Sequence, residues 1–120
     1  MDKWQSLQTF WESFGIPAYD ESSVPDNAVM PYITYTAEAS GFETILLLTA
    51  SIWYHSRSWI EVSQKADQIA QTLASYYLVK MDGGYLFLTQ GSPFAQRMKD
   101  DDDSVKRIFL NVMAEFFTAY

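Results

Sequence analysis

The sequence contains no cysteine and a single histidine, and these two scarcities exclude several kinds of chemistry. Without thiols there is no disulfide framework and no thiolate metal site. With His55 as the sole imidazole, a metal site with two histidines is excluded and a Ser-His-Asp triad has only one candidate base. A lone histidine at the end of a predicted strand is more often a capping residue than a general base. We therefore expect no catalytic residue, no metal and no cofactor.

Long apolar runs are also missing. The longest largely apolar run covers residues 45–54, far short of the ~20 residues that a membrane-spanning helix needs. The sequence begins MDKWQSLQTFW, which is amphipathic and lacks the uninterrupted apolar region of a signal peptide. We expect a soluble protein that does not enter a membrane and is not secreted by that route.

Basic residues are scarce as well. There are 8 Lys and Arg against 15 Asp and Glu, for a net charge of −7. Lys3 is the single base among the residues up to Leu47. Proteins that bind nucleic acid by neutralising phosphates have the opposite balance. We expect no specific binding of nucleic acid, although an acidic surface would let duplex DNA pass without adhering.

Aromatic residues, in contrast, are abundant. They make up 17% of the 120 residues, and apolar residues make up 48%. This is enough for one domain over residues 1–120 that buries about two-thirds of its unfolded surface. It is also more aromatic surface than so small a domain hides easily, so part of it is expected at an interface. Trp4 and Trp11, a heptad apart, fit either the core or such an interface.

The spacing of apolar residues predicts two helices. The first covers residues 2–14, with Asp2 as a suitable N-cap and Gly15-Ile16-Pro17 as a stop. The second begins at Ser58, which has the spacing of a capping box with Glu61. Its apolar stripe runs through Val62, Ala66, Ile69, Ala70, Leu73 and Tyr77.

Alternation and turn residues predict the strands. Asp82-Gly83-Gly84 is a strong turn signal that closes a hairpin, and residues 17–31, with three prolines, are expected to form an ordered loop. In residues 43–55 one face is wholly apolar and the other half apolar, as in a central strand covered mainly on one side. The order of elements predicts an α+β domain, a mainly antiparallel β-sheet with two helices packed on one face. Strands are expected over residues 32–39, 43–55, 78–81, 85–89 and 105–118. In the last of these, alternation predicts that the residues facing the core are Ile108, Leu110, Val112, Ala114 and Phe116.

Residues 91–104 are expected to form a long loop. Fourteen residues exceed the 2–5 that commonly join two strands, so we interpret the segment as one retained for contact with a partner. Phe94, Arg97 and Met98 are of types enriched at interfaces. The alternative, in which Phe94 folds back onto its own sheet, is equally open. Tyr19 and Val24, in the loop over residues 17–31, are the second group of candidate interface residues.

Asp100, Asp101, Asp102 and Asp103 are the most conspicuous charged feature. A Ca²⁺ or Mg²⁺ site needs carboxylates at alternating positions that converge on one ion, whereas consecutive aspartates splay apart. We interpret the four as a solvated loop or as an acidic surface that docks a partner or repels DNA. Further along the chain, Glu115 is expected to pair across strands with Arg107 or Lys80.

In order along the chain there are an N-terminal helix and the segments YITYTAEA, ETILLLTASIWYHS, SWIEVSQKADQIAQTL and GGYLFLTQGSPFAQRMKDDDDSVKRIFLNVMAEFF. In these segments, which cover most of its length, the chain resembles the tail-terminator (tail-completion) and related neck proteins of long-tailed bacteriophages.

The resemblance implies a non-enzymatic virion protein, assembled in the cytoplasm of the host bacterium and located in the tail or neck. Such proteins form a homo-oligomeric ring, commonly a hexamer, on the end of the tail tube. The ring stops polymerisation of the tube protein, offers a surface to the head connector and leaves a channel for DNA. No residue-level motif of the family transfers to this sequence.

Two alternatives to this function remain open at the level of sequence. One is a head-completion or minor capsid protein of the same virion. The other is a small-ligand-binding or hydrolytic α+β domain, which predicts a deep cavity between sheet and helices lined by carboxylates and His55.

Overall fold

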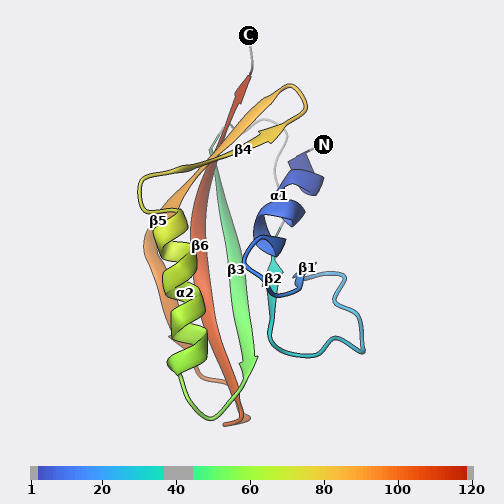
Figure 1. Cartoon of the computed structure of the whole chain (residues 1–120), viewed down its shortest axis with the longest axis vertical. Helices are drawn as coiled ribbons and strands as arrows, with labels where there is room; N and C mark the ends of the chain where they lie inside the picture. The colour runs from blue at the N-terminus through green and yellow to red at the C-terminus, as the bar shows by residue number, and fades with distance from the viewer. Residues whose placement is uncertain (1–2, 37–44, 119–120) are drawn as a thin grey trace.

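A computed structural model describes residues 3–36 and 45–118 of the chain. These residues form an α+β fold of two helices and six strands (Figure 1). The α+β class and the two helices are as the sequence predicts, and the structure has one strand more than the five expected. The predicted N-cap Asp2 and the end of the predicted strand at residues 37–39 lie outside the described residues. The elements are α1 (Lys3–Glu12), β1 (Ala18–Asp20), β2 (Tyr32–Tyr35), β3 (Ile45–His55), α2 (Ile60–Thr72), β4 (Tyr77–Met81), β5 (Gly84–Met98) and β6 (Val105–Thr118).

The six strands form one sheet in the order β1-β2-β3-β6-β5-β4. Only β1 and β2 run parallel; all the other neighbouring pairs are antiparallel. The long central pair, β3 and β6, is in register from Ile45 opposite Glu115 to His55 opposite Val105. At the far edge, β4 and β5 form the expected hairpin, in which Gly83 has a φ of 82° in the turn.

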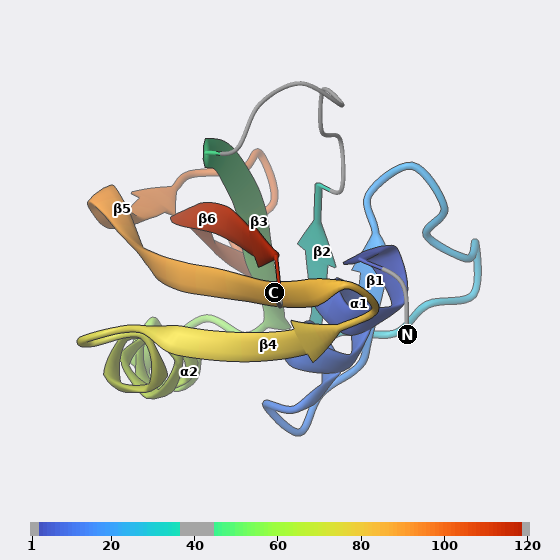
Figure 2. The same cartoon turned by 90° about the horizontal axis from the view of Figure 1, so that it is seen from above.

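Both helices pack on one face of this sheet, as predicted (Figure 2). On β3 the buried residues alternate as Leu48, Ala50 and Ile52, and they lie opposite Val112, Leu110 and Ile108 of β6. Helix α2 covers these positions with one apolar stripe, and α1 adds a second that is rich in aromatic residues. The buried residues on this side are Leu7, Phe10 and Trp11 of α1, Phe14 just after it, and Val62, Ala66 and Ile69 of α2.

Helix α1 contacts both edges of the sheet, because the β4–β5 hairpin curls over toward it (Figure 2). The Ser6 hydroxyl donates to the carbonyl of Lys80 on β4 over 3.3 Å. The Gln8 amide donates to the carbonyl of Ala18 on β1 over 2.8 Å. The Tyr35 hydroxyl also donates to Gln8, and burial, with smaller effects of Asp20 and Glu12, raises the pKa of Tyr35. Polar side chains of α1 thus bind backbone carbonyls at each edge strand.

The start of α2 differs from the predicted capping box. The helix begins at Ile60, its N-cap is Trp59, and no side chain caps it. Glu61 is therefore one position too early to complete a capping box. The Ser58 hydroxyl instead accepts a hydrogen bond from the Ile60 N–H over 3.1 Å. The predicted stripe also ends sooner, since Tyr77 lies on β4 and its ring is 5.3 Å from that of Phe10.

Two predicted loops contain strand. Residues 18–20, inside the expected loop over 17–31, form β1 by pairing with β2. The expected loop over 91–104 is wrong over half its length, because β5 continues to Met98 and only residues 99–104 connect it to β6. The turn-forming residues after Gln90 form a bulge, across which the register passes from Gln90 opposite Val112 to Ala95 opposite Leu110. Glycine and proline are therefore accommodated inside a strand by a bulge.

Candidate interaction surface

The side of the sheet opposite the two helices is its outer face. Strand residues alternate between the two faces, so the odd-numbered positions of β3 and β6 lie on this outer face. Neither helix covers it (Figure 2). It divides into an apolar half near the β4–β5 hairpin and a polar, aromatic half near the opposite end of β3 and β6.

The apolar half is a cluster of large side chains on neighbouring strands, here called the outer apolar patch. Leu47 on β3 is 67% exposed and lies opposite Met113 on β6, which is 42% exposed. The Phe87 ring is 5.1 Å from that of Tyr76 and 6.0 Å from that of Phe117. So many large apolar groups together on a protein surface are typical of a protein–protein contact. The patch consists of Leu47, Tyr76, Leu78, Tyr85, Phe87, Met113 and Phe117.

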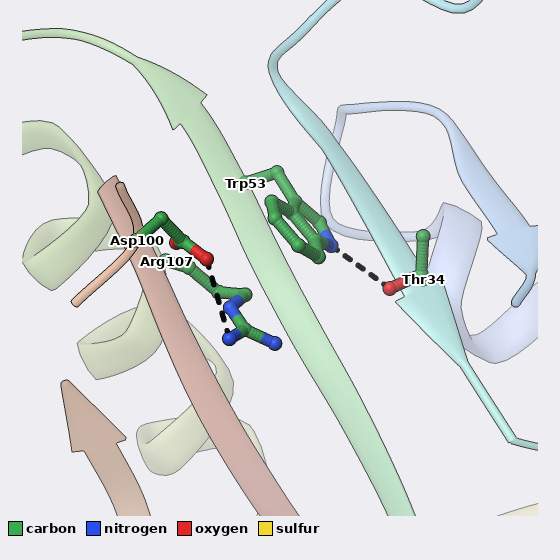
Figure 3. Close-up of polar contacts among 4 residues, drawn as sticks. All are labelled: Thr34, Trp53, Asp100 and Arg107. Atoms are coloured by element: carbon green, nitrogen blue, oxygen red, sulfur yellow. Dashed lines mark hydrogen bonds and ion pairs between the residues drawn. The ribbon is translucent and has the colours of Figure 1, made fainter. Parts of the chain in front are cut away.

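The polar half is a row of aromatic and charged side chains across four strands, here called the aromatic–cation row. The Tyr19 and Tyr32 rings are 5.7 Å apart, and those of Tyr32 and Trp53 are 6.4 Å apart. The Arg107 guanidinium lies 4.7 Å from the centre of the Trp53 ring. It also pairs with Asp100 over 3.4 Å (Figure 3). On the side of Trp53 away from Arg107, the Trp53 indole N–H donates to the Thr34 hydroxyl over 2.9 Å.

Replacing Arg107 with alanine should loosen this row. The change removes a cation from the face of Trp53 and leaves Asp100 without its ion pair. The side chains of Arg107 and Asp100 are each about a quarter exposed. We expect the free energy of unfolding, measured by urea denaturation, to fall by about 1–2 kcal/mol. The exposed Arg57 offers a matched control, because Arg57→Ala should change it by less than about 0.5 kcal/mol. Equal losses from the two variants would contradict the structural role of Arg107.

The structure separates the predicted interface residues. Tyr19 belongs to the aromatic–cation row, and Met98 is opposite Arg107 in the register of β5 and β6. Phe94 is half-buried against the hydrophobic core, as its alternative interpretation requires. Arg97 is exposed on β5 with its guanidinium 5.0 Å from the centre of the Trp59 ring. Val24 is half-buried in the connection between β1 and β2. Contact of these residues with a partner stays a prediction.

The four aspartates lie in the connection between β5 and β6 and have different surroundings. Asp100 is tied to Arg107, whereas Asp101 and Asp103 are exposed. Asp102 accepts hydrogen bonds from the Ser104 hydroxyl over 2.6 Å and from the Ser104 N–H over 2.8 Å. These two bonds, with smaller effects of nearby His55 and Arg57, lower the pKa of Asp102. Within residues 3–36 and 45–118, no three potential metal ligands cluster.

The predicted pairing of Glu115 with Arg107 is wrong, because Arg107 lies near the other end of β6 and pairs with Asp100. Glu115 is half-buried on the outer face, opposite Phe87 of β5 and Ile45 of β3. Lys80 is exposed on β4. Among the residues that the structure describes, neither Glu115 nor Lys80 takes part in an ion pair. The outer apolar patch thus contains an acid, Glu115, and has a base, Lys80, at its rim, and the two do not form an ion pair with each other.

The hollows on the surface bear on the ligand-binding alternative. One of about 270 Å³ lies between α1 and β4, and its lining includes Ser6, Phe10 and Lys80 but no carboxylate of the described residues. Another, of about 220 Å³, is lined by Trp59, by three of the aspartates and by Lys106, but not by His55. The Ser104 hydroxyl donates to Asp102, which is the arrangement of a capped turn and not of a nucleophile bonded to an imidazole.

No helix in the described part of the chain is long and apolar enough to cross a membrane.

Sequence reasoning missed the outer apolar patch as a surface. The alternation in residues 105–118 predicts the core face of this strand, and the same alternation puts Met113 and Phe117 on its other face. The signal that could have found the patch is the apolar character of both faces over residues 85–88 and 112–117. A strand apolar on both faces, in a chain with helices for only one, leaves an apolar face uncovered.

Comparison with solved structures finds a similar fold. The fold is similar to that of a chain in the virion of a native gene transfer agent particle, with a TM-score of 0.63 and 16% sequence identity. The match covers 94% of this chain and 90% of that chain. At this identity the likeness shows a shared fold over nearly the whole of both chains. No protein-family model and no curated protein sequence matches this chain.

Proposed function

We propose that this chain is a structural, non-enzymatic component of a phage-like virion. The observation that carries the proposal is the shared fold with a chain of a gene transfer agent virion, which extends over 94% of this chain. Folds host many functions, so the surface of this chain must also fit the role. It does, because the outer face exposes a large apolar patch of the kind that assembly buries.

Within the virion, we propose the role of tail terminator. The chain would form a closed ring, a hexamer, on the last ring of the tail tube, and would present its other side to the head connector. A closed ring needs two different contact patches on each subunit. The outer face and the connection between β1 and β2, with Val29 78% exposed, are two such surfaces. The acidic turn at residues 100–103 would face DNA in the channel without binding it.

A tube-assembly assay tests this role. The tail tube protein from the same genome is polymerised with and without the purified chain, and tube lengths are measured by negative-stain electron microscopy. We expect added chain to stop elongation and to appear as a ring of density at one tube end. Tubes of unchanged length with bare ends would contradict the tail-terminator role. Immunogold labelling of virions then separates it from a head-completion or minor capsid role, for which the label would lie at the head.

A further inference from the structure

The outer apolar patch contains a charge pattern that matches itself. Glu115 lies within the patch on β6, and Lys80 lies at its rim on β4. Each is free of ion pairs within the described part of the chain. A half-buried carboxylate among apolar side chains is stabilised when a cation is brought to it. The patch therefore fits a partner that presents an apolar surface with one base near one acid.

The positions of the two charges are related across β5. Lys80 is opposite Tyr85, and Glu115 is opposite Phe87. The base and the acid are thus on opposite sides of β5. Their positions along the strand direction differ by two residues, the separation of Tyr85 and Phe87. Tyr85 and Phe87, both on the outer face, lie between them.

We propose that a second copy of this chain docks on the outer apolar patch, sheet face to sheet face, as a two-fold dimer. A two-fold axis in the plane between the faces, crossing β5 between Tyr85 and Phe87 at right angles to the line from Lys80 to Glu115, places Lys80 of each copy opposite Glu115 of the other. A two-fold interface is self-complementary, so one contact of this kind generates its twin. The dimer buries both apolar patches and forms two ion pairs.

Two further observations favour this mode of association. The edge strands β1 and β4 have backbone carbonyls bound by Gln8 and Ser6 of α1, which disfavours pairing of a second copy along either edge. The exposed groups of the patch are mainly aromatic rings and Met113, types enriched where protein surfaces bury one another. This inference concerns the free protein and goes beyond the proposed function. Because the proposed ring would use the same outer face, the dimer would have to dissociate before a ring forms.

Charge exchange tests the dimer. The full chain is examined by sedimentation velocity over a wide concentration range, as the wild type, Lys80→Glu, Glu115→Lys and the double variant. We expect a concentration-dependent dimer for the wild type. Each single reversal places like charges opposite each other and should raise the dissociation constant at least about tenfold. The double variant restores both pairs and should return to within about threefold of the wild type.

Matched controls separate this contact from a general effect of charge. Asp67→Lys on α2 makes the same charge change as Glu115→Lys, and Arg57→Glu before α2 makes the same change as Lys80→Glu. Both positions are exposed to solvent and away from the patch, so neither substitution should alter the dimer. Phe117→Ser should weaken the dimer without any change of charge, and circular dichroism checks that each variant is folded. A monomer at all concentrations, or a double variant as weak as the singles, would overturn the proposal. Failure of tube capping alone would leave it intact.

Discussion

Replacing Trp11 with alanine is expected to lower the free energy of unfolding by about 3–5 kcal/mol. Trp11 is 1% exposed, and its ring lies 4.9 Å from Phe10 and 6.3 Å from Tyr35, which it stacks against. The cavity would open between α1 and β2, where the helix is joined to the sheet. Because small domains are stable by about 5–15 kcal/mol in total, this variant should be close to unfolding. Urea denaturation followed by circular dichroism measures the loss.

Trp11→Phe is the matched control for this prediction. The Trp11 indole N–H is buried and has no hydrogen-bond partner in the structure, so phenylalanine keeps most of the apolar volume and removes an unsatisfied donor. We expect it to cost less than half of what Trp11→Ala costs. Equal losses would indicate that the indole N–H has a partner and that the polar contact, not the volume, holds α1 in place.

Replacing Gly84 with alanine is expected to disrupt the end of the β5–β6 pair. A Cβ atom at Gly84 would lie 1.9 Å from the carbonyl oxygen of Phe117 and 3.0 Å from the Phe116 ring. The nearest atom belongs to the backbone, so the two strands must separate to make room. We expect a loss of about 1–3 kcal/mol, the usual cost of overpacking, measured by urea denaturation. Tyr85 and Phe117 would also move apart, so the proposed dimer should weaken in sedimentation.

The neighbouring Gly83 provides the contrast. A Cβ atom there meets nothing within 4 Å, but its φ of 82° lies in the left-handed region. Gly83→Asn should therefore cost less than about 1 kcal/mol, because asparagine tolerates this conformation, and should leave the dimer unchanged. If Gly83→Asn were as damaging as Gly84→Ala, the turn conformation and not the close approach of β6 would control this region.

Trp11→Ala and Gly84→Ala both change residues on the core side of the sheet, and both are expected to affect the outer apolar patch on the other side. Trp11 holds α1 against the sheet, and α1 in turn binds the carbonyls of Ala18 and Lys80 at the two edges. Gly84 allows β5 to approach β6 so closely that Tyr85, Phe87 and Phe117 meet on the outer face. The outer apolar patch therefore depends on packing that lies on the other side of the sheet.

The sequence alone determined the α+β class, the two helices and their side of the sheet. It also determined the β4–β5 hairpin. These features depend on local patterns, because alternation separates the faces of a strand and Asp82-Gly83-Gly84 specifies a turn. The same patterns located the core residues of β6, including Leu110 and Val112.

Only the tertiary structure decided which polar and apolar groups come together on the surface. The sequence favoured a loop over residues 91–104, yet pairing with β6 extends β5 through a bulge to Met98. It predicted that Glu115 pairs with Arg107 or Lys80, yet the residues that the structure describes form neither pair, and Arg107 lies near the other end of β6. The physical reason is that a strand pattern specifies which face a side chain lies on but not its neighbour on the next strand. That neighbour is set by register, and register is fixed by packing between distant parts of the chain.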